Sequence, residues 1–468
     1  MITVIMAGGR GTRIAEYSKE ITGRVLPKPM IPISGVPVLE WELTSLRDQG
    51  FKKFIITVSY LANEIMDYFG DGSGVSPATG KPFGVQIEYF QEQEPLGNAG
   101  ALYKLRGNLV DDADGSADFL LLNADSIFDL DFRRMVAYHR AKAAMVTLFT
   151  HPNSHPYDSG LIIASANGSV EKWLTKEDIR PKYYKNRVNA GVHVLNVAAL
   201  DEALALSDID VSQIGKVQDD GKIYKIDLDR QILKPLCGRK TPGVYNVYCY
   251  DSPEYVKDMG TPERFEAVER DFKAGIVQAK NLSYKQKAIF LDRDGTLNKY
   301  VGFLRKTEEL ELLPKTAEAV RKINASGYLA IVITNQPVVA RGEVSFAELE
   351  EIHYKLETEL GKAGAYIDGL YYCPHHPDSG YVGEVSNLKM NCTCRKPKPG
   401  MILQAAKDFN IDLTASWIVG DSEVDIVCGK NAGVHTALLS RDKTEDYGQE
   451  VTVDNLLDFV EEHMEVYK

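Results

Sequence analysis

Short apolar runs alternate with amphipathic stretches along the whole chain. The runs include ITVIMAGG, KKFIITVS, ADFLLLNAD, KAIFLDRDGT, GYLAIVITN and ASWIVGD, and the first and fourth end at glycine or aspartate, as buried parallel strands do. The stretches between them, such as VPVLEWELTSLRDQG, KTAEAVRKINASG and PGMILQAAKDFN, have the apolar spacing of helices with one buried face. This alternation predicts an α/β fold built of βα units, with mostly parallel sheets.

Two of the apolar runs look like the first strands of separate domains, one beginning at Ile2 and the other at Lys287. Before the second of them, ERFEAVERDF has helical spacing and is followed by a polar connection. We therefore expect a first domain over residues 1–270, a linker over 271–286 and a second domain over 287–468.

Composition narrows the class of protein. The chain has 468 residues, enough for two domains with a core each, and a net charge of −12, which argues against a general affinity for nucleic acid or anionic membrane. No apolar run approaches the roughly 20 residues of a membrane helix, and the opening run lacks the basic start of a signal peptide. We expect a cytoplasmic protein that binds phosphates through local sites; its oligomeric state does not follow from the sequence.

The first apolar run leads into MAGGRGTR. Gly8, Gly9 and Gly11 allow backbone N–H groups to approach a phosphate chain, and Arg13 adds positive charge. Lys28 lies between two prolines in LPKPM and therefore offers an ammonium group with little backbone freedom. A glycine-rich loop can also be only a tight turn, so this motif needs the support of others.

Three further blocks supply polar groups of matching chemistry. Gln91 and Glu92 precede the glycine turn of EPLGNAG and suit the hydrogen-bonding edge of a nucleobase. Asp125 ends the run FLLLNAD, where a carboxylate can hold Mg²⁺, and Asp258 in VKDMGTPERF offers a second carboxylate.

In this order the blocks AGGRGTR, PKPM, GNAGAL, NAD, NAGVHV and DMGTPERF resemble the sugar-phosphate nucleotidyltransferases, from residue 1 to about 270. The resemblance implies a Rossmann-like mixed sheet and in-line attack of a sugar 1-phosphate on the α-phosphorus of a nucleoside triphosphate, with release of pyrophosphate. It assigns the triphosphate to Gly8, Gly9, Gly11, Thr12 and Arg13, the base to Gln91 and Gly97, Mg²⁺ to Asp125 and Asp258, charge stabilisation to Arg13 and Lys28, and the sugar phosphate to Lys176 and Asn189. The loop from Gly11 to Lys28 is longer than is usual in that family.

The run that begins the second half ends in FLDRDGTL, with Asp292 and Asp294 two residues apart. Such a string alone is compatible with a calcium loop or an ordinary turn. It is followed, however, by TN at 334–335, by Lys396 in RKPKPG and by GDSEVD with Asp421 and Asp425. This order resembles the haloacid dehalogenase superfamily of phosphatases, over residues 287 to about 440.

That resemblance implies a second Rossmann-like domain, in which Asp292 attacks the phosphorus and forms an aspartyl-phosphate. Asp294 would protonate the leaving alkoxide and then activate water. Mg²⁺ would be bound by Asp292, by Asp294 through its backbone carbonyl and by Asp421. The phosphate and the rest of the substrate would be bound by Thr334, Asn335, Arg395 and Lys396.

Residues 371–400 hold a cluster of potential metal ligands. Cys373 and His375 form a C-x-H pair, and Cys392 and Cys394 form a C-x-C pair, which together match a closed structural zinc site. His376 could take the place of His375, and the alternative reading is of unpaired core cysteines beside a surface histidine. Zinc would order the loop and orient the lysine that follows it in CRKPKP.

The loop CPHHP…CTCRKPKPGM is similar to that of the D-glycero-D-manno-heptose 1,7-bisphosphate phosphatases and of the related histidinol-phosphate phosphatases. In TNQPVVARG, Pro337 and Val338 replace the Ser-Gly usual there. The two resemblances together imply a bifunctional enzyme that makes heptose 1-phosphate and activates it with GTP to GDP-heptose. The base does not follow from the residues. The alternatives are a histidinol-phosphate phosphatase fused to another transferase, use of ATP or another nucleotide, and a regulatory protein that senses sugar nucleotides without catalysis.

Overall fold

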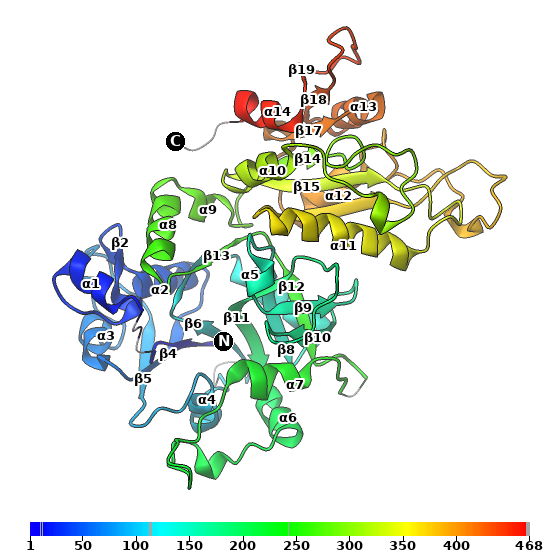
Figure 1. Cartoon of the computed structure of the whole chain (residues 1–468). Coiled ribbons are helices and arrows are strands. Elements are labelled where there is room, and N and C mark those ends of the chain that lie inside the picture. Colours follow the sequence, from blue (N-terminus) through cyan, green and yellow to red (C-terminus); the bar gives the residue numbers. More distant parts are fainter. Residues whose placement is uncertain (10, 12, 112–114, 242, 465–468) are drawn as a thin grey trace. The chain divides into compact units, whose positions relative to one another are not determined.

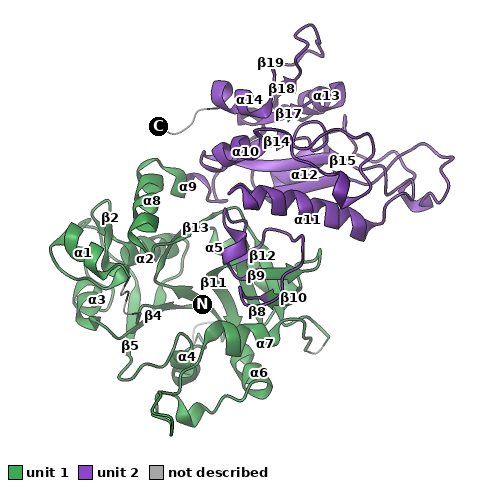
Figure 2. Cartoon of the chain, viewed as in Figure 1, with its two compact units in different colours: residues 1–150, 162–173, 189–278 green, residues 151–161, 174–188, 279–468 purple. Residues whose placement is uncertain are grey.

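The computed structural model describes residues 1–468 except 10, 12, 112–114, 242 and 465–468. The chain forms two compact units (Figures 1 and 2). The first comprises residues 1–150, 162–173 and 189–278, and the second comprises 151–161, 174–188 and 279–468. Among the helices of the described residues, none combines the length and the apolar character needed to cross a membrane.

The first unit contains a mixed nine-stranded sheet. Its centre is parallel: β1 (Ile2–Met6) lies between β4 (Lys53–Val58) and β6 (Asp118–Asn123), and β5 (Gln86–Gln91) follows β4. Beyond β6 the sheet continues with antiparallel β11 (Val188–Asn196). The remaining strands are β8 (Val146–His151), β9 (Leu161–Ala164), β10 (Val170–Leu174) and β12 (Val247–Asp251).

Successive residues of the central strands pack into different cores. Val4 lies in a cluster with α4 (Gly100–Leu105), α6 (Ala198–Leu206) and α7 (Lys234–Leu236). Ile5 lies in the cluster with α2 (Val38–Asp48), α3 (Ala62–Phe69) and α5 (Phe132–Lys142), so helices cover both faces of the sheet. A third cluster joins the segments around α1 (Ala15–Thr22), α8 (Pro262–Lys273) and α9 (Ile276–Ala279).

Two small pairings also shape this unit. The short strands β2 (Pro32–Ile33) and β3 (Val36–Pro37) form a hairpin. Strand β7 (Ser126–Asp129) pairs antiparallel with β13 (Tyr255–Asp258). In this register Asp258 lies opposite Ser126, which brings the end of the unit's last strand beside Asp125.

The second unit contains a six-stranded, entirely parallel sheet in the order β16-β15-β14-β17-β18-β19. Helices α10 (Thr316–Asn324), α11 (Phe346–Lys362) and α14 (Leu456–His463) pack on one face, and α12 (Gly400–Asp408) and α13 (Glu423–Ala432) on the other. The strands are β14 (Lys287–Leu291), β15 (Tyr328–Asn335), β16 (Gly369–Cys373), β17 (Trp417–Gly420), β18 (His435–Leu439) and β19 (Val451–Val453).

The α/β architecture predicted from the hydrophobic pattern is confirmed, with one mixed and one parallel sheet. All six apolar runs quoted above form strands. The residues expected to form the linker are more ordered than a polar connection, because α8 extends to Lys273 and α9 follows within the next few residues.

Candidate active sites

A cavity of about 790 Å³ lies at the carboxyl ends of β1, β4 and β6 in the first unit. The three strands are parallel neighbours, so the residues that follow them meet at one edge of the sheet. Gly8, Gly9 and Gly11 line the cavity after β1, and Asp125 lines it after β6. The sequence-predicted phosphate loop and carboxylate therefore belong to one site.

Lys28 lines this cavity and forms ion pairs with two carboxylates. Its Nζ donates to Asp258 Oδ1 at 2.9 Å and lies 3.4 Å from Asp125 Oδ2, and its side chain is 8% exposed. Burial by itself would raise the pKa of Asp258, but the charges and hydrogen bonds of Lys28 and Arg264 outweigh it and lower that pKa. The pairing of β7 with β13 thus holds two carboxylates around one ammonium group.

Gln91, which the resemblance assigns to the base, does not line the cavity. It ends β5 with an exposed side chain, whereas its neighbour Glu92 lines the cavity. Glu92 Oε2 accepts a hydrogen bond from Leu96 N at 3.3 Å, and Oε1 lies 3.5 Å from where a Cβ on Gly8 would be. Burial raises the pKa of the Glu92 carboxyl. The two polar neighbours were not distinguishable in the sequence, because only the course of the chain after β5 decides which one faces inward.

The other predicted residues of this half divide into two groups. Arg13 and Gly97 line the cavity, together with Lys225, which the sequence analysis did not single out. Lys176 is exposed and belongs to a segment of the second unit, and Asn189 Oδ1 lies 3.1 Å from His193 Nε2 within β11. Neither Lys176 nor Asn189 lines the cavity. Thr12 lies outside the described residues.

A second cavity, of about 350 Å³, lies at the carboxyl ends of β14, β15 and β17 in the second unit. These strands are adjacent and parallel, which brings the residues after them together. The lining includes all the catalytic and substrate-binding residues predicted for this half: Asp292, Asp294, Thr334, Asn335, Arg395, Lys396 and Asp421.

Lys396 is fully enclosed at the base of this cavity. Its Nζ donates to Asp292 Oδ1 at 2.5 Å, to Asp425 Oδ1 at 2.6 Å and to the Ile333 carbonyl at 3.1 Å. Its backbone N–H also donates to Asn335 Oδ1 at 3.0 Å. Burial opposes the charge, but the two carboxylates outweigh it and raise the pKa of Lys396, so the side chain is a fixed cation.

Three carboxyl groups converge beside this lysine. Asp292, Asp421 and Asp425 each place one oxygen within 4.8 Å of the others, which makes a hard-oxygen set suited to a divalent cation. Burial raises the pKa of Asp292 despite the opposing charge of Lys396, and burial together with Asp425 raises the pKa of Asp421 to about 6. Gly295, at φ +93°, permits this approach, since a Cβ there would lie 1.9 Å from Asp421 Oδ2. Asp425 was not predicted as a ligand.

The Asp294 side chain is held apart from that cluster. It accepts hydrogen bonds from Arg293 Nη2 at 2.7 Å, from Asn298 Nδ2 at 3.0 Å and from Gln336 Nε2 at 3.0 Å. Burial raises its pKa, but Arg293 and these hydrogen bonds dominate and lower it. The Asp294 carboxylate is thus held by three side chains and is not one of the three carboxyl groups that converge beside Lys396.

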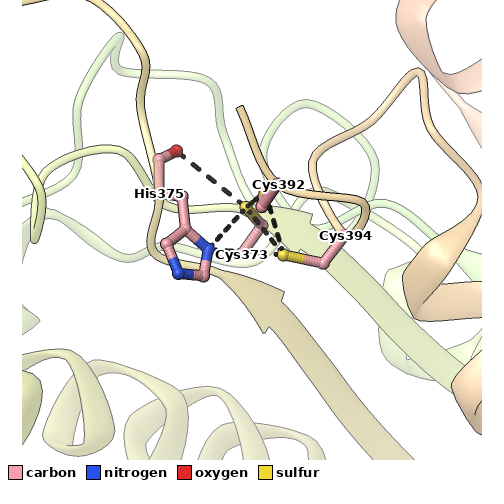
Figure 3. Close-up of side chains that lie close together, drawn as sticks. All are labelled: Cys373, His375, Cys392 and Cys394. Atoms are coloured by element: carbon pink, nitrogen blue, oxygen red, sulfur yellow. Dashed lines mark hydrogen bonds between the residues drawn. The ribbon is translucent and has the colours of Figure 1, made fainter. Parts of the chain in front are cut away.

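The side chains of Cys373, His375, Cys392 and Cys394 lie close together and could bind one metal ion (Figure 3). The Sγ atoms of Cys373, Cys392 and Cys394 lie 3.2 to 3.4 Å apart, and His375 Nδ1 lies 3.4 Å from Cys394 Sγ and 3.7 Å from Cys373 Sγ. His376 instead accepts a hydrogen bond from Asp378 N through Nδ1, so His375 is the histidine of the cluster. A tetrahedral Zn²⁺ with Zn–S bonds of about 2.3 Å separates its ligands by roughly 3.8 Å, close to these spacings.

Comparison with known proteins identifies both halves. Residues 2–221 match the family model described as "Nucleotidyl transferase", and residues 393–459 match a "HAD-hyrolase-like" model. A D-glycero-beta-D-manno-heptose-1,7-bisphosphate 7-phosphatase from Pasteurella multocida is 41% identical over 154 residues, 33% of this chain and 81% of that protein. The chain belongs to the heptose-bisphosphate 7-phosphatase family.

A D-glycero-alpha-D-manno-heptose-1,7-bisphosphate 7-phosphatase from Burkholderia mallei is 42% identical over 159 residues, 34% of this chain and 82% of that protein. The 7-phosphatase family therefore includes relatives named for either anomer. Among solved structures, HddC from Yersinia pseudotuberculosis is 20% identical with a TM-score of 0.41, covering 58% of this chain and 99% of that one. With its nucleotidyl transferase domain, this 7-phosphatase family member is an enzyme with transferase and phosphatase halves.

Proposed function

We propose that the chain removes the 7-phosphate of D-glycero-D-manno-heptose 1,7-bisphosphate and transfers GMP from GTP to the heptose 1-phosphate that remains. The observation that carries the proposal is the joint presence of the 7-phosphatase site around Asp292 and a nucleotidyl transferase domain in one polypeptide. The product of the first reaction is a sugar 1-phosphate, which is the class of acceptor that the second reaction requires.

In the phosphatase half, Asp292 is the nucleophile. A carboxylate oxygen attacks the 7-phosphorus, the bond between phosphorus and the sugar oxygen breaks, and Asp294 gives its proton to the departing alkoxide. The Asp294 carboxylate then takes a proton from water, whose oxygen attacks the phosphorus and releases Asp292 and inorganic phosphate. The free site holds Asp294 ionised, and the charge of a bound phosphate dianion favours the protonated form that the first step needs.

Mg²⁺ fits the carboxyl cluster of this site. Asp292, Asp421 and the Asp294 carbonyl are the proposed ligands, with Asp425 holding Lys396 from the other side. The ion supplies charge that offsets the repulsion between carboxylates and phosphate. Lys396 and Thr334 bind phosphoryl oxygens, and Asn335 and Arg395 extend the contacts to the substrate. Zn²⁺ in the cysteine cluster is structural, since no ligand position there is left for water.

In the transferase half, the acceptor phosphate is already ionised, so the protein needs no nucleophile of its own. Its oxygen attacks the α-phosphorus of the triphosphate and pyrophosphate leaves. Arg13 and Lys28 stabilise the charge on the reacting phosphates, and Gly8, Gly9 and Gly11 hold the phosphate chain. Asp125 and Asp258 converge on Lys28 Nζ and form the proposed Mg²⁺ site, whose charge would assist the same attack. The resemblance also assigns the sugar phosphate to Lys176 and Asn189, but neither side chain lines the cavity of about 790 Å³.

The chemistry of Glu92 supports guanine as the base. An ionised carboxylate only accepts hydrogen bonds, and guanine is the nucleobase with two adjacent donors, N1–H and the 2-amino group. Glu92 and Gly97 both line the cavity, and Oε1 of Glu92 does not take part in the contact that Oε2 makes to Leu96 N. Adenine, uracil and cytosine would each present a hydrogen-bond acceptor to the Glu92 carboxylate, which cannot donate to it.

The phosphatase assignment is tested by steady-state kinetics with heptose 1,7-bisphosphate and histidinol phosphate as separate substrates. We expect phosphate release from the heptose substrate with the higher kcat/KM by at least about 100-fold. A preference for histidinol phosphate would overturn the proposed substrate and favour the alternative fusion.

A further inference from the structure

The zinc loop supports one wall of the phosphatase cavity. The residues of that wall are distant in sequence from the zinc ligands. The cavity is lined by Phe303 from the segment after β14, and by Pro337 and Val338 from the segment after β15. We call residues 299–305 the entrance segment, residues 337–344 the valine segment and residues 376–391 the outer zinc loop. All three lie in the second unit.

The valine segment packs directly against the outer zinc loop. Val385 N donates to the Ala340 carbonyl at 3.0 Å, and Leu388 belongs to the same hydrophobic cluster as Val338. Gly342, at φ +71°, approaches so closely that a Cβ there would lie 1.9 Å from the Gly383 carbonyl oxygen. Val338, which departs from the family's Ser-Gly pattern, is 1% exposed and contributes to this packing.

Arg341 joins all three segments through its planar guanidinium. The guanidinium carbon lies 4.0 Å from the centre of the Phe303 ring and 4.5 Å from that of Tyr381. Arg341 is 9% exposed, so water weakens these contacts little. Tyr381 is in turn fixed within the outer zinc loop, because Glu384 accepts a hydrogen bond from its backbone N–H at 3.1 Å and Lys389 Nζ lies over its ring.

Lys396 depends on the zinc loop much less. Its ammonium group is held by Asp292, Asp425 and the Ile333 carbonyl, and its backbone by Asn335. These partners come from the sheet edge and α13, and none belongs to the outer zinc loop. If the outer zinc loop loses its order, Lys396 therefore stays in place, but Phe303 loses the packing that the loop supports through Arg341.

We propose that Arg341 is a positioning residue, which transmits the order of the zinc loop to the cavity wall by stacking between Tyr381 and Phe303. The wall sets how well the sugar part of the substrate is held, whereas the reacting phosphate is held by Lys396. The inference rests on the proposed phosphatase function for its kinetic consequence, but the contact between the three segments does not depend on it.

The test uses the full chain with Arg341→Lys and Tyr381→Ala. The first keeps the charge and loses the planar face, and the second removes a ring that does not line the cavity. Tyr381→Phe keeps the ring and is the conservative rescue. Arg321→Ala removes an exposed arginine of α10 and is the matched control.

We expect both disruptive variants to raise KM for heptose 1,7-bisphosphate about 3- to 10-fold with kcat within about twofold, since a desolvated cation–π contact is worth that much. Zinc content should stay at that of the wild type, and amide hydrogen exchange over residues 299–305 should be faster. Cys392→Ser should lose zinc and accelerate exchange over the same residues. Tyr381→Phe and Arg321→Ala should match the wild type throughout.

Unchanged exchange over 299–305 in Tyr381→Ala would overturn the proposal, as would a fall in kcat at constant KM. If the wild-type chain releases no phosphate from heptose 1,7-bisphosphate, the proposed function fails instead. The hydrogen-exchange and zinc measurements then test, without any activity assay, whether Arg341 couples the zinc loop to residues 299–305.

Discussion

Lys28 in the first unit and Lys396 in the second each lie between two carboxylates, but in opposite surroundings. The partners of Lys28 are partly exposed, with Asp125 and Asp258 side chains 54% and 36% accessible. The partners of Lys396 are enclosed, with Asp292 and Asp425 at 11% and 0%. The first arrangement is screened by water and can rearrange around a large ligand, whereas the second is already assembled before substrate arrives.

The difference matches the size of the two proposed substrates. The proposed nucleoside triphosphate and sugar phosphate would both have to enter the cavity of about 790 Å³, which Lys28 lines. In the proposed function, the cavity of about 350 Å³ receives one phosphate group beside Lys396 and Asp292, which are already paired in the free site. The two sites should therefore respond to different substitutions and conditions.

Asp292→Asn should lower phosphate release at least about 1,000-fold, because the amide cannot form the aspartyl-phosphate. Pyrophosphate release from GTP and supplied heptose 1-phosphate should remain near the wild-type rate. Phosphatase activity close to wild type in this variant would remove Asp292 from the mechanism.

Asp125→Ala should have the reverse effect. It removes one of the two carboxylates at Lys28, and nucleotidyl transfer should fall about 100-fold or more while phosphate release is unchanged. The assay is pyrophosphate release over a Mg²⁺ titration. Transfer that persists with the wild-type Mg²⁺ dependence would contradict the role of Asp125 as a ligand.

Glu92→Gln should change the choice of nucleotide. The amide offers one acceptor and one donor in place of two acceptors, so kcat/KM for GTP should fall about 10- to 100-fold. UTP and ATP should lose much less, since their base edges pair an acceptor with a donor. Gln91→Glu, at the exposed neighbour, is the matched control and should leave the order of nucleotides unchanged.

The smallest effect concerns pH. The pKa values of Asp292 and Asp421 are raised by burial and by neighbouring carboxylates, so these groups bind protons more readily as pH falls, and Mg²⁺ must displace those protons. The Mg²⁺ concentration for half-maximal phosphatase activity should therefore rise about tenfold or more as pH falls from about 8 to about 5. The pKa of Asp258 is lowered, so the transferase should need little extra Mg²⁺ over this range. Equal pH dependence at both sites would contradict this difference between them.

Much of this architecture could be predicted, because strands ending in polar residues place those residues at a common edge. Asp125, Asp292 and Asp421 lie at the carboxyl ends of strands, as the hydrophobic pattern indicated. The choice between Glu92 and Gln91 depends on the turn after β5, and that between His375 and His376 on the fold of the zinc loop. No local pattern distinguishes such neighbours.

The sequence also did not predict which distant segments of the chain pack together. Residues 151–161 and 174–188 fall within the nucleotidyl transferase match yet belong to the second unit. There Asn186 N donates to Glu357 Oε2 at 2.8 Å and Tyr184 N to Thr358 Oγ1 at 3.0 Å. These partners are more than 170 residues apart, and neither motif nor periodicity connects them. The packing of Arg341 between Phe303 and Tyr381 likewise could not be predicted from a motif or from periodicity.

The central claim is that one chain carries out both reactions in succession. The most direct test incubates the purified chain and Mg²⁺ with heptose 1,7-bisphosphate and, in turn, GTP, ATP, UTP or CTP, following phosphate and pyrophosphate separately. The account predicts that phosphate appears in every reaction, and that pyrophosphate appears with GTP only after phosphate release has begun. Pyrophosphate formation with none of the four nucleotides, while phosphate is released in all, would contradict it and support a sensing role for the first half.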